Sequence, residues 1–96
     1  MSRTRTRQAD AAVLAHTAER MGTGPAAVKK LIRLSDRAYR ANERQCNSGC
    51  KTIERLARLA QTAVESYAAA LGLATMWPGL HPAFVTGDGC QVHLPD

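Results

Sequence analysis

The clearest shortage in this 96-residue chain is of aromatic side chains: it has one tryptophan, two tyrosines and one phenylalanine. Alanine is plentiful instead, so helices can pack closely but bury little apolar area each. A chain of this length forms one domain with a modest core, and a partner or a second copy could supply further burial. No apolar run approaches the ~20 residues of a bilayer span, and residues 11–15 are too short and mixed for a secretory signal. We therefore expect a cytoplasmic protein.

Recognisable catalytic motifs are also missing. The sequence shows no paired carboxylates suited to acid–base chemistry, no Ser/His/Asp set and no glycine-rich phosphate loop. Cys50 lies near an expected helix start, where a thiol pKa can be lowered, but no sequence feature places a histidine beside it. We therefore expect neither enzyme activity nor a cofactor.

Three cysteines are an odd number in a chain without an export signal, which argues against a disulfide framework. Cys46-x3-Cys50 and Cys90-x2-His93 supply four residues of the types that bind zinc. Neither pair is a CxxC, however, and residues 90 and 93 point to opposite faces of a regular strand. We therefore predict three reduced, partly buried cysteines and no metal, with zinc on these four residues as the alternative.

Positive charge is in excess, with a net charge of +5. Six basic residues oppose two acidic ones in residues 25–46. In this stretch, positions suited to a core recur at the spacing of one helix face: Val28, Leu31, Ile32, Ser35, Ala38, Tyr39, Asn42 and Cys46. Basic positions recur roughly opposite, within an arc of ~80°: Lys29, Arg33, Arg37, Arg40 and Arg44. This basic stripe suits a polyanion or an acidic protein surface, and the alternative is a solvated helix face without a ligand.

Turn formers and apolar periodicity predict a mainly α fold of three helices with a small C-terminal β-hairpin packed on them. We expect a mobile basic arm over residues 1–7, a single domain over residues 8–96, and helices over residues 8–21, 25–45 and 51–71. The third helix is apolar on more than one face, because Leu59 and Val64 widen a stripe that includes Leu56. That pattern is typical of the central helix of a small packing unit or of a helix at a dimer seam.

The C-terminal segment, about residues 73–96, has a different character. Two β-prone runs, residues 83–86 and 90–94, flank a glycine-rich turn and predict the hairpin, and residues 73–77 could form a third extended segment. Because an isolated hairpin is marginally stable, we expect it to lie on the helices, anchored by Trp77 and Phe84.

Asn42 is a polar residue on the core face of the second helix. We predict that its side chain bonds to a neighbouring loop, with the turn at Asn47 in reach. The alternative is that it fixes the register with a partner helix.

Residues 34–47 end in Gln45-Cys46-Asn47, and the chain closes with Val92-His93-Leu94-Pro95. This combination resembles small uncharacterised proteins of bacteriophages and prophages, which share a Gln-Cys-Asn signature between two helices and a short C-terminal strand pair. The resemblance implies a phage-derived accessory protein that works in the cytoplasm of a bacterial host.

Our leading hypothesis, which leans on that resemblance, is a protein that binds a macromolecular partner through Lys29, Arg33, Arg37, Arg40 and Arg44. Its most specific form is an anti-CRISPR-like inhibitor that docks on a host defence complex, with or without bound nucleic acid. The alternative is a helix-turn-helix DNA-binding regulator, because Ala18, Gly22, Val28 and Leu31 match the packing and turn positions of that motif. A homodimer is compatible with either function.

Overall fold

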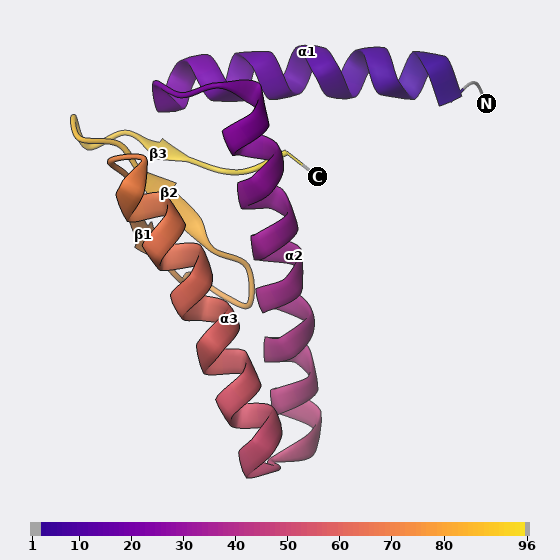
Figure 1. The fold of residues 1–96 in the computed structure, drawn as a ribbon, viewed down its shortest axis with the longest axis vertical. Helices are drawn as coiled ribbons and strands as arrows, with labels where there is room; N and C mark the ends of the chain where they lie inside the picture. Colours follow the sequence, from indigo (N-terminus) through magenta and orange to yellow (C-terminus); the bar gives the residue numbers. More distant parts are fainter. Residues whose placement is uncertain (1–2, 96) are drawn as a thin grey trace.

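The fold is a three-helix assembly with a small antiparallel sheet on one side (Figure 1). The computed structural model describes the backbone of residues 3–95 and the side chains of residues 11–95. The elements are α1 (Arg3–Met21), α2 (Pro25–Ser48), α3 (Lys51–Ala70), β1 (Ala74–Met76), β2 (Ala83–Val85) and β3 (Gln91–Val92). The predicted mainly α class, with a C-terminal β element in contact with the helices, is confirmed.

Helix α1 begins at Arg3, five residues before the expected start at Gln8. The backbone of residues 3–7 is therefore helical, where an arm without regular structure was expected. The segment has no apolar periodicity, but arginine is a good helix former and neither glycine nor proline interrupts it. Met1 and Ser2, the rest of the expected arm, lie outside the described residues.

Helix α2 follows the predicted pattern closely. Pro25 occupies its first turn after the N-cap Gly24, where the missing proline N–H costs no helical bond. The helix runs three residues past the expected end at Gln45 and stops at Gly49, whose φ of 68° is accessible to glycine at little steric cost. The Gly49 N–H donates to the Gln45 carbonyl at 3.2 Å, which closes the last turn.

Helices α2 and α3 run antiparallel and supply most of the core (Figure 1). The buried residues of α2 are Val28, Leu31, Ser35, Ala38 and Asn42, and those of α3 are Ala57, Ala60, Val64 and Ala68. The alanines on both buried faces allow a close approach of the two helices. Residues 43–56, at the turn between the helices, include no buried side chain.

The C-terminal sheet has three strands in the order β1-β2-β3, so the possible third extended segment is a genuine strand. Phe84 on the central strand faces Thr75 and Val92 on its neighbours. It is fully buried, as predicted. Trp77 is only half-buried, and its indole Nε1 donates to the Glu65 carboxylate at 2.9 Å. Phe84 is therefore the main anchor of the sheet, and Trp77 is a peripheral one.

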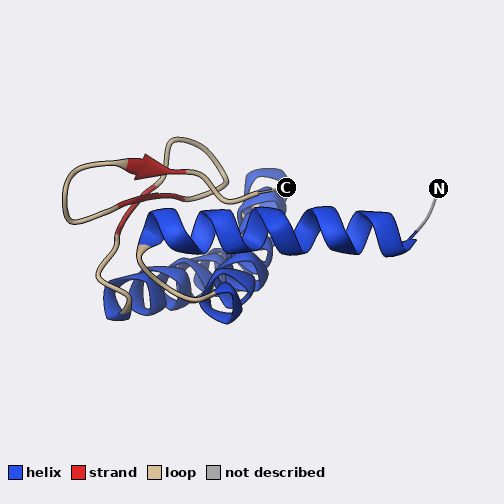
Figure 2. Cartoon of the chain, turned by 90° about the horizontal axis from the view of Figure 1, so that it is seen from above, coloured by secondary structure: helices blue, strands red, loops and turns tan. Residues whose placement is uncertain are grey.

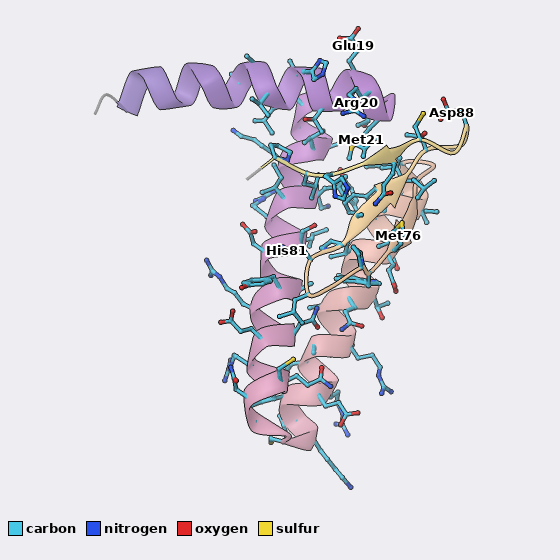
Figure 3. The ribbon with its side chains drawn as sticks, turned by 180° about the vertical axis from the view of Figure 1, so that it is seen from behind. Glu19, Arg20, Met21, Met76, His81 and Asp88 are labelled. Carbon is cyan, nitrogen blue, oxygen red and sulfur yellow. The ribbon has the colours of Figure 1, made fainter. Side chains whose placement is uncertain are left out.

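The strands cover one side of the α2–α3 pair (Figure 2), and the loop between β1 and β2 attaches there. Asn42 Nδ2 donates to the Leu80 carbonyl of this loop at 3.1 Å, and Asn42 Oδ1 accepts from Gln61 Nε2 at 2.6 Å. His81 of the same loop stacks on Tyr39, with ring centroids 4.0 Å apart, and Figure 3 shows it beside α2. The expectation that Asn42 bonds a neighbouring loop is correct. Its partners, however, are Leu80 and the facing helix rather than the turn at Asn47.

Within residues 3–95, no helix has both the length and the apolar character needed to cross a membrane.

Candidate partner-binding groove

The five basic side chains predicted for α2 are all exposed. In the sequence they are interspersed with the buried residues of α2. Because the helix has 3.6 residues per turn, the two sets lie on opposite sides of it. The structure therefore places Lys29, Arg33, Arg37, Arg40 and Arg44 at the surface.

Four of these residues line one wall of an open groove of about 680 Å³ between α2 and α3. From α2 the groove is lined by Arg33, Asp36, Arg37, Arg40, Ala41 and Arg44. From α3 it is lined by Leu56, Leu59, Ala60 and Ala63. We call this feature the α2–α3 groove. The Asn42–Leu80 and Trp77–Glu65 hydrogen bonds and the Tyr39–His81 stack, which join the sheet and its loop to the helices, involve no groove residue.

The apolar wall of the groove is unusually exposed. Leu56 is 49% and Leu59 is 61% solvent-accessible, although both leucines belong to the broad apolar surface predicted for α3. The core of this chain uses the adjacent face, with Ala57, Ala60 and Val64, and leaves the leucines uncovered. The sequence thus indicated an excess of apolar residues on α3. It did not indicate that these residues lie beside the basic stripe of α2.

The charge of the groove is strongly one-sided. Asp36 is the single acidic residue among its lining side chains, against four arginines. Among the side chains described for residues 11–95, the one ion pair joins Arg58 to Glu54, at 3.6 Å, and neither residue lines the groove. The four groove arginines therefore remain available to acidic groups from outside the chain.

The two lysines of α2 have different surroundings. Lys29 does not line the groove but instead lines a hollow between α1 and α2, with Val13, Leu14 and Ile32. The ammonium of Lys30 lies 4.6 Å from the centre of the Tyr67 ring, a cation–π contact within the chain. Of the five predicted binding residues, the structure therefore brings the four arginines together in the groove. Lys29 lies outside the groove and shares the α1–α2 hollow with Arg33.

The alternative zinc ligands lie at opposite ends of the molecule. Cys46 and Cys50 flank the turn between α2 and α3, whereas Cys90 and His93 belong to the β3 region near α1 (Figure 1). In the described part of the chain, no three histidine, cysteine or acidic residues form a cluster able to hold a metal ion.

All three cysteines are exposed, so the prediction that they are partly buried is wrong. They occupy the last turn of α2, the N-cap of α3 and the hairpin turn before β3, and each of these positions lies at the surface. The backbone N–H groups of Ile53 and, to a smaller extent, Thr52 at the start of α3 favour the thiolate and lower the pKa of Cys50. The direction of this pKa shift agrees with the position of Cys50 near a helix start.

Comparisons of the chain with protein-family models, with curated protein sequences and with solved structures find no match. They leave the resemblance to phage proteins as a prediction. The case for a function therefore depends on the groove itself.

Proposed function

We propose that this protein works by binding another macromolecule through the α2–α3 groove, and that the target is an acidic protein surface. The observation that supports this most strongly is the pairing of uncompensated arginines with exposed leucines in one groove. Protein interfaces are enriched in arginine, and apolar side chains fill the dry centre of the contact. A groove with one basic wall and one apolar wall provides both the arginines and the apolar side chains of such an interface.

The leucine wall also favours protein over nucleic acid. Phosphates would satisfy Arg37 and Arg40, but a phosphate backbone would leave Leu56 in water. In the helix-turn-helix alternative, α2 would enter the major groove of DNA by its first turn. That turn presents Pro25, Ala26 and Ala27, which have no polar side-chain atoms for base edges.

The more specific proposal is a phage-type accessory protein that inhibits a bacterial defence system in the manner of anti-CRISPR proteins. Its support is the Gln45-Cys46-Asn47 resemblance, joined to a groove that suits docking rather than catalysis. A small basic protein could occupy an acidic surface of an effector complex and exclude its normal partner or nucleic acid.

The test is capture of partners from a bacterial lysate, with and without nuclease, by three forms of the protein. The groove variant carries Arg33→Glu, Arg37→Glu and Arg40→Glu. A matched control carries Arg20→Glu, Lys51→Glu and Arg58→Glu, which makes the same change in net charge on residues that do not line the groove. All six residues are exposed, so melting temperatures should change little.

We expect a protein that the wild type and the control capture, that the groove variant loses, and that nuclease does not release. Equal capture by the groove variant would refute the role of the groove. Binding to free duplex DNA should be weak and should largely vanish near physiological salt. Sub-micromolar, sequence-selective DNA binding at that salt would instead establish the regulator.

A further inference from the structure

We infer that the occupant of the α2–α3 groove is an amphipathic α-helix with an acidic flank, supplied by a different protein. This inference rests on the proposed function and specifies the partner's shape. The partner helix would set apolar side chains on the leucines of α3 and carboxylates on the arginines of α2, so that two helices become a three-helix bundle.

The dimensions of the groove suit a short straight helix. Arg33 and Arg44 are eleven positions apart on α2, which corresponds to about 16 Å along the helix axis, or three turns. On the opposite wall, Leu56, Leu59 and Ala63 have the i, i+3, i+7 spacing of a continuous helical ridge. A third helix can interdigitate its own i, i+3 or i+4, i+7 side chains with such a ridge.

The backbone of the groove favours a helix over an extended segment. Both walls are helical, and their internal N–H and C=O groups are already bonded along α2 and α3. An added strand gains affinity from main-chain bonds to an open sheet edge, and no strand lines this groove. Affinity must therefore come from side chains, and a helix brings its own backbone already satisfied.

The positive charge of the groove determines the sign of the charge that the partner helix must carry. Four arginines and one aspartate line it, so a basic helix would meet like charges while it buried its apolar face. The same criterion argues against a second copy of this chain. Its helices α2 and α3 each carry more basic than acidic residues.

The experiment uses fluorescently labelled synthetic peptides and measures their binding to the full chain by anisotropy. The probe peptide has leucines at i, i+3, i+7 with glutamates on one flank. A permuted peptide has the same composition but no continuous apolar face. A third peptide replaces each glutamate by lysine. The protein variants are Leu56→Ser/Leu59→Ser and Arg37→Glu/Arg40→Glu. The control is Met76→Ser, which alters a comparably exposed apolar residue on β1.

We expect the probe peptide to bind, and the permuted and lysine peptides to bind about tenfold more weakly or worse. The leucine and arginine variants should each lose about tenfold in affinity for the probe peptide, and Met76→Ser should not change it. Circular dichroism melts of every variant test whether the fold is retained.

Three results would overturn the inference. Equal affinity for the permuted peptide would show that charge alone drives binding. No binding of the probe peptide would show that the groove does not accept a helix. A dimeric wild type together with a monomeric leucine variant would show that a second copy of the chain occupies the groove. If the groove variant still fails to capture the partner from lysate in the first two cases, the proposed function stands without the helix.

Discussion

Asn42 offers the sharpest test of how this small core is held together. Its side chain is 6% exposed and makes two hydrogen bonds, one to the Leu80 carbonyl and one from the Gln61 amide. Replacing Asn42 by alanine removes both bonds, each worth about 1 kcal/mol net. Both bonds are only partly buried, so we expect water to reach the abandoned Leu80 carbonyl and Gln61 amide and the further penalty to be small. We expect Asn42→Ala to lower the free energy of unfolding by about 2 kcal/mol.

For a domain of this size, a loss of that magnitude lowers the melting temperature by about 8–16 °C. Urea unfolding should be followed both by circular dichroism and by the fluorescence of Trp77, the one tryptophan in the chain. The first signal reports the helices and the second reports the loop that Asn42 holds, so coincident curves would show a single cooperative transition.

A double-mutant cycle with Gln61→Ala isolates the bond between the two side chains, and we expect a coupling energy of about 1 kcal/mol. A loss below about 0.5 kcal/mol for Asn42→Ala would place this residue among ordinary surface positions and refute the reasoning.

Phe84→Ala should cost about 3–5 kcal/mol in urea unfolding because its ring is fully buried, whereas the half-buried Trp77→Ala should cost less than half as much. Equal losses would contradict the assignment of Phe84 as the main anchor. The lowered pKa of Cys50 means that more thiolate is present at any pH below the ordinary thiol range. Its alkylation by iodoacetamide, followed by mass spectrometry, should therefore reach half its maximal rate at a lower pH in folded than in urea-unfolded protein, and identical profiles would show that the helix start does not affect the thiol.

Much of the fold could be predicted from local signals. The core face of α2 repeats regularly from Val28 to Asn42, and Pro25 and Gly49 mark the ends of the helix by fixed or left-handed backbone angles. Such features depend on a few neighbouring residues, so the sequence displays them directly.

Features that depend on distant contacts were predicted less well. The sequence placed Leu56 and Leu59 on an apolar surface, but only the packing of α2 against α3 shows that they stay exposed beside the arginines. The partners of Asn42 belong to an adjacent helix and to a loop 38 residues away. The size of Trp77 predicts an anchor of the sheet, whereas its indole N–H makes an exposed hydrogen bond to Glu65 at the surface.

The turn between α2 and α3 has a dynamic consequence. Residues 43–56 contain no buried side chain, so local opening of this tip costs less free energy than opening the segment between Val28 and Asn42. Its backbone amides should exchange hydrogen faster than those nearer the sheet. A ligand that crosses Arg44 and Leu56 would hold both helices of the tip together. Binding in the groove is thereby linked to the order of a segment that opens more readily than the middle of α2.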